Sequence, residues 1–555
     1  MGLLLLLLSL SIVSGVAEET PSGIAKVYGY ARYWESSEKI GYIRYARVEL
    51  WEDTYIDNLL ATTNTDLEGY YEFNISLTGS KNVYAKINCE SFVAVVTYGL
   101  FDSRYWERTP TQTALEGETT FLGVYYAPIQ EVWWHAFDYA TQEHIWIRDQ
   151  VNWIRPQVQI KYPSGNHPTS YGDVIELPDI NNYPWGRATV YHEYAHCVMC
   201  TLYGGFPPGS CSDTCECPQG KHYVNSVADS GFAFKEGWAV FMQCAVDGDP
   251  RNMATHNLGD VDGDGTQNYY YTTIEDNRYA VGGRTYKWYH GRCFSPGHDG
   301  NCVEGAAAGI LWDMFDPAND DRLSMGFYPI WYILSTYEPQ SMTAFWDHWV
   351  NTYGQKKELC AIYSDHGITT LGMTESLFYS TSFFVAGDRA YCTDVLGSAK
   401  IAFGLAKGGA YENPEGRTDI ILTSAEHDNG NLMPVGGPAV NPVATEFDEY
   451  MGITYTHIEN SYFAIHCEGY TIALDVANTY PYEDICIVYV GQENSRNVLQ
   501  VWGYGWRGTY AGSVFMGNPQ NWQVYSNCHM LMLRWRDFNG DGLVQVNEIS
   551  VETVK

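Results

Sequence analysis

The stretch that decides how the centre of this chain folds is His192-Glu193-Tyr194-Ala195-His196. A helix returns to the same face after four residues, so His192 and His196 stack one above the other and can share a zinc ion. Glu193 lies one position away, where its carboxylate can reach a metal-bound water rather than the metal, as a general base must. The pattern therefore predicts a zinc centre with Glu193 as the catalytic base.

The residues around this motif predict that it lies on a buried helix. Apolar residues follow one stripe of the helix, and glycines and prolines then end it. The stripe consists of Ala188, Ala195, Met199 and Leu202, and the terminating residues are Gly204, Gly205, Pro207 and Pro208. A core helix whose histidines bond only to neighbouring groups stays open as the alternative.

A zinc site needs a third protein ligand and an open position for water. One spacing is excluded at once, because metzincins place Gly and His where this chain has Met199 and Leu202. Glu236, in the stretch Phe-Lys-Glu-Gly-Trp-Ala of residues 234–239, offers a carboxylate at the start of a second helix. His222 and Asp229 are competing candidates for the third ligand.

The two motifs together resemble the gluzincins, in particular the fungalysin and thermolysin-like secreted peptidases. This resemblance implies that His192, His196 and Glu236 hold zinc and that Glu193 is the base. The chain departs from the pattern in two places: 39 residues separate His196 from Glu236, and Val240 stands where an orienting Asp is common. An acid that orients a ligand histidine must then come from elsewhere, or the affinity for zinc suffers.

Two further parts of a peptidase site can be sought in the sequence. Gluzincins stabilise the oxyanion with a His or Tyr, for which His290, Tyr289 and Tyr271 are candidates. An extended peptide substrate would lie against an edge strand, and Val174, Ile175 and Glu176 form the strand best placed for it.

Two acidic loops resemble calcium sites. The first fits the twelve-residue EF-hand pattern, including a bidentate Glu at its last position. Its predicted ligands are Asp537, Asn539, Asp541, Leu543 and Glu548. The second has the first half of the same pattern and predicts a structural calcium ion at Asp260, Asp262 and Asp264, with Glu275 or Asp276 completing it.

Fourteen cysteines fit disulfides in an oxidising compartment. Five of them, at positions 197, 200, 211, 215 and 217, lie on the catalytic helix or in the insert that follows. A second, structural zinc there is the alternative to disulfides.

The whole chain predicts a multidomain protein, in which an α/β zincin-like domain is flanked by an N-terminal β-sandwich and a C-terminal β-rich domain. Residues 65–73 resemble the hairpin of transthyretin-like modules. The predicted segments are a signal peptide at 1–17, the β-sandwich at 22–127, the peptidase domain at 128–372, the β-rich domain at 373–530, and the calcium loop and tail at 531–555.

The formal charge of −34 argues against nucleic acid as a partner, because phosphate binding needs clustered Lys and Arg. After removal of the leader no segment is apolar for long enough to cross a membrane. We therefore expect a secreted, extracellular or cell-surface zinc metalloendopeptidase that binds calcium and takes protein or peptide substrates, with β-domains that could contact surfaces or polymers. The alternatives are an inert adhesive or structural protein and a zinc aminopeptidase.

Overall fold

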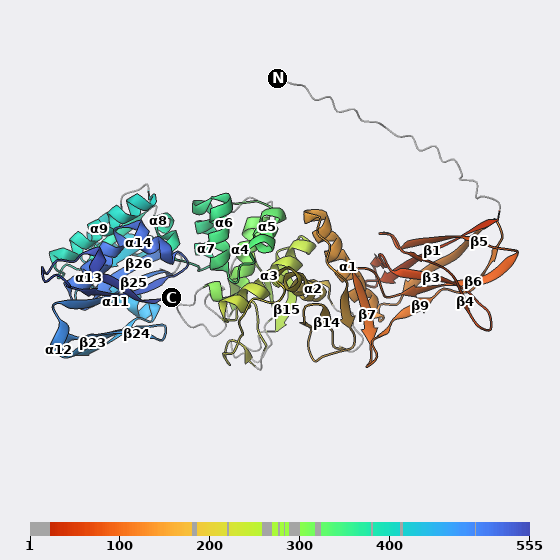
Figure 1. Ribbon diagram of the computed structural model, residues 1–555, viewed down its shortest axis with the longest axis horizontal. Helices are drawn as coiled ribbons and strands as arrows, with labels where there is room; N and C mark the ends of the chain where they lie inside the picture. Colours follow the sequence, from red (N-terminus) through yellow and green to blue (C-terminus); the bar gives the residue numbers. More distant parts are fainter. Residues whose placement is uncertain are drawn as a thin grey trace, which may run out of the picture. The chain divides into compact units, whose positions relative to one another are not determined.

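The computed structural model describes residues 23–179, 186–218, 221–257, 269–275, 278–281, 284–287, 300–316, 323–378, 381–410, 414–493 and 496–555. Within these ranges the protein is multidomain and mixed α/β, with several separate sheets (Figure 1). It divides into two compact units, Met1–Ile145 with Ile154–Val190, and Trp146–Trp153 with Tyr191–Lys555. Among the described residues, no helix is both long and apolar enough to span a bilayer.

The first unit begins with two β-sheets. In one, β1 (Ile24–Trp34) pairs in parallel with β11 (Thr119–Ala127) and antiparallel with β2 (Ile40–Tyr42) and β5 (Tyr70–Ser76). The other contains β10 (Gln112–Leu115), β6 (Ser80–Asn88), β3 (Arg47–Glu52) and β4 (Asn58–Asn64) in that order, with β9 (Trp106–Arg108) also on β6. Along β1 every second residue is buried, as expected for a strand with one face on a core.

The predicted hairpin at residues 65–73 is wrong. β4 pairs with β3 and β5 pairs with β1, so the turn between them connects the two sheets. Local alternation of apolar and polar residues cannot distinguish the two cases, because it predicts strands but not their partners. The stretch Thr-Asp-Leu-Glu-Gly is a crossing turn in which the Asp66 side chain accepts backbone hydrogen bonds from Glu68 and Tyr70.

A third sheet combines strands from both sides of the predicted boundary at residue 127. Its order is β13 (Thr169–Ser170), β14 (Val174–Glu176), β12 (Val158–Lys161), β7 (Ala94–Tyr98) and β8 (Ser103–Arg104). β7 and β12 run parallel, and the connection between them includes the long helix α1 (Val132–Val151). Two parallel strands must be joined by a long crossover connection such as this one. Local sequence patterns predict the strands but not that β7 and β12 are neighbours.

The central part of the second unit is mainly helical. It contains α2 (Arg187–Tyr203, which starts in the first unit), α3 (Ser230–Asp247), α4 (Glu304–Phe315), α5 (Phe327–Tyr337), α6 (Met342–Tyr353) and α7 (Lys356–Asp365). A four-stranded antiparallel sheet accompanies them, formed by β15 (Arg251–Asn257), β16 (Tyr269–Thr273), β17 (Arg278–Val281) and β18 (Arg284–Lys287). Short helices η3 (Gly300–Cys302), η4 (Leu371–Met373) and α8 (Thr374–Leu377) connect these elements to their neighbours.

The C-terminal part is an α/β domain, so the predicted β-rich domain is wrong. Its main sheet has the order β20 (Glu415–Thr418), β19 (Ser382–Ala386), β21 (Asn431–Val435), β26 (Arg496–Gly503), β25 (Glu483–Glu493), β27 (Met530–Arg536) and β28 (Ile549–Val554). A small sheet consists of β22 (Thr454–Ile458), β23 (Tyr462–Cys467) and β24 (Tyr470–Asp475). The helices are α9 (Cys392–Gly408), α10 (Ser424–Asn429), α11 (Pro442–Met451), α12 (Val476–Thr479), α13 (Trp506–Met516), α14 (Pro519–Trp522), η5 (Gln523–Tyr525) and η6 (Val546–Glu548).

Two of these helices are rich in glycine, which explains why the sequence favoured turns. Gly lowers helix propensity by about 1 kcal/mol relative to Ala. A Cβ on Gly397 of α9 would lie 2.6 Å from the hydroxyl of Ser513 in α13, and one on Gly404 would lie 2.0 Å from the carbonyl oxygen of Met516. The glycines therefore allow α9 and α13 to pack closely, a tertiary reason that local propensity cannot show.

Candidate metal centre

Two helices of the second unit bring the predicted zinc ligands together. α2 carries His192 and His196 one turn apart, and α3 carries Glu236 in its second turn. The indole Nε1 of Trp238 donates a hydrogen bond of 3.1 Å to the carbonyl of Ala195, which fixes α3 against α2. Glu236 therefore faces the histidines partly because Trp238, two residues further along α3, bonds to α2.

The ligand atoms of the three residues form a compact triangle. Nε2 of His192 and Nε2 of His196 lie 3.2 Å apart, and Oε2 of Glu236 lies 3.3 Å and 2.9 Å from them. Within the described part of the chain, this is the only group of three or more His, Cys, Asp or Glu side chains whose ligand atoms all come within 4.8 Å of one another. Two imidazole nitrogens and a carboxylate oxygen are a donor set that suits zinc.

Glu193 is buried beside this triangle. Only 7% of the Glu193 surface is exposed. Burial raises the pKa of its carboxyl to about 7, and the nearby His192 opposes this rise. A carboxyl whose pKa lies near neutrality can both accept and return a proton at neutral pH. The environment therefore suits the role of general base that the sequence predicts for Glu193.

His222, one of the competing third ligands, lies at the edge of the triangle. Its Nε2 is 3.8 Å from Oε2 of Glu236, and its Nδ1 is 2.8 Å from Oε2 of Glu304 on α4. Burial lowers the pKa of His222, but the carboxylates of Glu236 and Glu304 outweigh it and raise the pKa to about 9. His222 thus lies beside the centre, and Glu304 orients its ring. The sequence analysis did not single out Glu304 for this role.

Asp229, the other competing ligand, is used elsewhere. Its carboxylate accepts hydrogen bonds from the backbone nitrogen of Ser210, at 2.9 Å, and from the Ser210 hydroxyl, at 3.3 Å. Asp229 stands immediately before α3 and ties the insert to the start of that helix. It does not join the group of ligand atoms formed by His192, His196 and Glu236.

The carboxylate of Glu236 has a second partner that the sequence analysis missed. Nζ of Lys235 lies 3.0 Å from Oε1 of Glu236 and packs over the rings of Phe206 and Phe232. Because Lys235 holds Oε1, the other oxygen, Oε2, faces His192 and His196. The ion pair therefore fixes which oxygen of Glu236 is presented to the histidines.

The described residues supply no acid that orients His196 in place of the Asp that Val240 replaces. Val240 is buried, and Nδ1 of His196 is buried with no hydrogen-bond partner among the described residues. In many zinc sites that nitrogen donates to a carboxylate or a carbonyl, which orients the ring. Here the His196 ring is oriented by packing instead, with Phe206 edge-on at 6.1 Å between ring centroids.

Several other predicted site residues belong to the first unit or lie outside the described residues, and their roles remain predictions. Val174, Ile175 and Glu176 form β14, which pairs with β12 and β13 in the first unit. Asp260, Asp262, Asp264, Tyr289 and His290 lie outside the described residues, and so does the side chain of Tyr271 in β16. Glu275 accepts a hydrogen bond from the indole of Trp312 on α4.

The C-terminal acidic loop connects two strands, β27 and β28, and ends in the short 3-10 helix η6, so it lacks the two flanking α-helices of an EF-hand. The carboxylate of Asp537 accepts hydrogen bonds from the backbone of Gly540 and Gly542, both of which have left-handed backbone angles, φ +74° and +70°. Glu548 accepts hydrogen bonds from Trp535 Nε1, at 3.1 Å, and from the backbone of Phe538, at 3.3 Å. The loop is preshaped around its first and last predicted calcium ligands, and calcium binding remains a prediction.

The insert between α2 and α3 contains a disulfide. Cys211 and Cys217 are bonded, with their Cα atoms 5.9 Å apart. This bridge follows the expectation of disulfides in the insert rather than a second zinc ion. It closes a short loop that precedes His222 and so stiffens the approach to the centre.

Comparison with known proteins gives one informative match. The model of the family described as "Mycolysin C-terminal domain" matches residues 144–364, which include the three clustered side chains, and associates this segment with secreted metallopeptidases. No curated protein matches the chain. Among solved structures, the crystal structure of a 9R-lipoxygenase from Cyanothece PCC8801 is 11% identical over 33% of this chain and 23% of that chain, with a TM-score of 0.14, a likeness too slight to support any statement about fold.

Proposed function

We propose that this protein is a secreted zinc-dependent metalloendopeptidase of the gluzincin type, with Glu193 as the general base. The observation that carries the proposal is the convergence of His192, His196 and Glu236 from two helices, with Glu193 buried next to them. The match of residues 144–364, which include these side chains, to the Mycolysin C-terminal domain also supports it.

The donor set fits a zinc ion, which His192, His196 and Glu236 would hold. When bound, zinc supplies Lewis acidity toward a carbonyl oxygen and lowers the pKa of water. The Glu193 carboxylate would accept a proton from the attacking water and return it to the leaving amine, because it is buried beside the proposed ligands. Burial of Glu193 and Glu236 keeps bulk water from competing for these groups.

The test is digestion of casein by the full-length protein after chelator treatment, followed by zinc add-back. Activity should return with zinc, and Glu193→Gln should lower it by about 10²–10⁴-fold while zinc still binds. Glu338→Gln is the matched control, because Glu338 is exposed at the end of α5. Activity that survives Glu193→Gln removes Glu193 as the base.

The products decide between the remaining classes. Internal fragments of casein support an endopeptidase, whereas single released residues indicate an aminopeptidase. A protein that binds zinc stoichiometrically but cleaves neither casein nor a library of short peptides is an inert member, and the adhesive or structural role then replaces the enzyme.

A further inference from the structure

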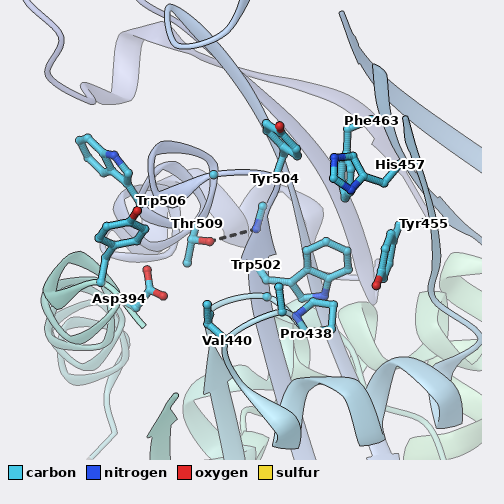
Figure 2. Close-up of a pocket in the computed structure, with 15 residues that line it drawn as sticks. Asp394, Pro438, Val440, Tyr455, His457, Phe463, Trp502, Tyr504, Trp506 and Thr509 are labelled. Carbon is cyan, nitrogen blue, oxygen red and sulfur yellow. Dashed lines mark hydrogen bonds between the residues drawn. The ribbon is translucent and has the colours of Figure 1, made fainter. Parts of the chain in front are cut away.

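The C-terminal α/β domain contains a cavity of about 230 Å³ that the proposed function does not use (Figure 2). It lies at the carboxyl ends of two parallel strands: Gly437 and Val440 follow β21, while Gly503 and Trp506 end or follow β26. Open α/β sheets bind their ligands at this edge, where loops leave the strands. The location alone therefore marks the cavity as a candidate ligand site.

Six of the fifteen residues that line the cavity are aromatic: Tyr391, Tyr455, Phe463, Trp502, Tyr504 and Trp506. Trp502 and Phe463 are buried, with 1% and 6% of their surfaces exposed, whereas Tyr455 and Tyr391 are 50% and 68% exposed at the rim. Figure 2 shows Asp394 and Trp506 on one side of the cavity and Tyr455 on the other, with Trp502 between them. A ligand in this space would meet aromatic rings on more than one side.

The wall also contains one buried carboxylate. Asp394, in the first turn of α9, is 3% exposed, and its Oδ1 is buried with no hydrogen-bond partner among the described residues. A Cβ added to Gly436, just after β21, would lie 2.6 Å from Oδ2 of Asp394. Only glycine therefore allows the chain to pass so close to this carboxylate. Burial raises the pKa of Asp394 to about 7, and the described residues provide no cation that opposes this.

A buried carboxylate without a partner is costly, because it loses its hydration and gains nothing in return. Elsewhere in the same domain this cost is offset: Asp484 accepts backbone hydrogen bonds from Ile485, Gly505 and Gly508. The described residues give Oδ1 of Asp394 no such hydrogen bond. Asp394 lines the cavity, so a cation that enters it would supply a partner for this carboxylate.

We infer that this cavity binds a small organic cation, a primary or methylated ammonium group, between the aromatic rings and the carboxylate of Asp394. An ammonium group satisfies both features of the wall at once, since it pairs with the carboxylate and is attracted to ring faces. One carboxylate is too few oxygen ligands for calcium or magnesium, and it repels anions. At about 230 Å³ the cavity is smaller than sites for drug-sized ligands, which suits a head group or a single side chain.

The experiment is isothermal titration of the full-length protein with choline and with its neutral isostere 3,3-dimethylbutan-1-ol. These two probes share shape and differ in charge. Choline should bind at least about tenfold more tightly than the alcohol, and Asp394→Asn should remove that preference. Tyr455→Leu, at the exposed rim, should weaken choline binding several-fold without unfolding the domain.

Asp388→Asn is the matched control, because Asp388 is an exposed carboxylate in the loop before α9. It should bind choline like the unaltered protein. Thermal unfolding provides a second readout: Asp394→Asn should leave the domain at least as stable, whereas an Asp with a purely structural role would destabilise it when replaced. Equal binding of the two probes, unchanged choline binding by Asp394→Asn, or binding of glucose in place of choline would each overturn the inference.

Discussion

Gly237, the residue after the proposed ligand Glu236, should be intolerant of a methyl group. A Cβ at this position would lie 2.5 Å from the Cβ of Ala307, 2.8 Å from the carbonyl oxygen of Glu304 and 3.0 Å from the nitrogen of Ala308. Carbon atoms pack best at about 3.5–4.0 Å. Gly237→Ala therefore forces α3 and α4 apart by about 1 Å.

The consequences for stability and for the metal differ. Overpacking costs about 1–3 kcal/mol, but alanine regains about 1 kcal/mol of helix propensity, so the net loss of stability is about 0–2 kcal/mol. The metal is affected more, because Oε2 of Glu236 lies only 2.9 Å from Nε2 of His196 and moves with α3. By analogy with other changes just outside a metal's ligands, zinc affinity should fall about 10–100-fold.

Competition with a chromogenic chelator measures the zinc affinity, and thermal unfolding measures the stability. Gly205→Ala is the control, because a Cβ there meets nothing within 4 Å. It should change neither quantity. If Gly237→Ala binds zinc as tightly as the unaltered protein, then packing against α4 does not hold Glu236 in place and the reasoning is refuted.

Three further predictions concern other parts of the chain. Burial raises the pKa of Asp448 to about 8 from 3.8, so the folded state retains a proton that the unfolded chain releases; stability should fall by a few kcal/mol as the pH rises from about 4 to about 8. Asp448→Asn should remove that fall, measured by thermal unfolding at a series of pH values, and a persistent fall would contradict the assignment. Glu304→Gln should lower casein hydrolysis by about tenfold, through a higher KM or a lower kcat, with zinc content unchanged, because His222 loses its anionic partner; loss of zinc instead would show that Glu304 supports the ligands. Calcium should stabilise the C-terminal domain by about 2–3 kcal/mol at roughly 100-fold excess over its Kd, and Asp541→Ala should abolish the calcium-dependent rise in Tm; a Tm that EGTA leaves unchanged would contradict the calcium loop.

The clustering of His192, His196 and Glu236 could be predicted because each part of it is locally encoded. The spacing of His192 and His196 is one helical turn, and Glu236 lies in a recognisable motif of its own. Lys235 and Glu304 were missed for a different reason. Lys235 pairs with Oε1 of Glu236, and Glu304 bonds to Nδ1 of His222. Such atom-level contacts are not encoded locally, and Glu304 and His222 are 82 residues apart in the sequence.

The C-terminal domain shows where local patterns fail. Its helices α9 and α13 contain glycines that suit close packing, so propensity pointed to turns instead. The cavity beside Asp394 was invisible because its wall is assembled from strand ends that are distant in the chain. Pairing of β1 with β11, and of β7 with β12, was likewise not encoded in any single segment.

X-ray absorption spectroscopy at the zinc edge tests the central claim most directly, because it reports the atoms bound to the metal. For the reconstituted full-length protein we predict only nitrogen and oxygen neighbours at about 2.0–2.2 Å, with the outer-shell scattering of two imidazoles. Glu236→Ala should change the oxygen contribution and leave both imidazoles. Sulfur neighbours at about 2.3 Å, or a spectrum without imidazole scattering, would contradict a centre built from His192, His196 and Glu236.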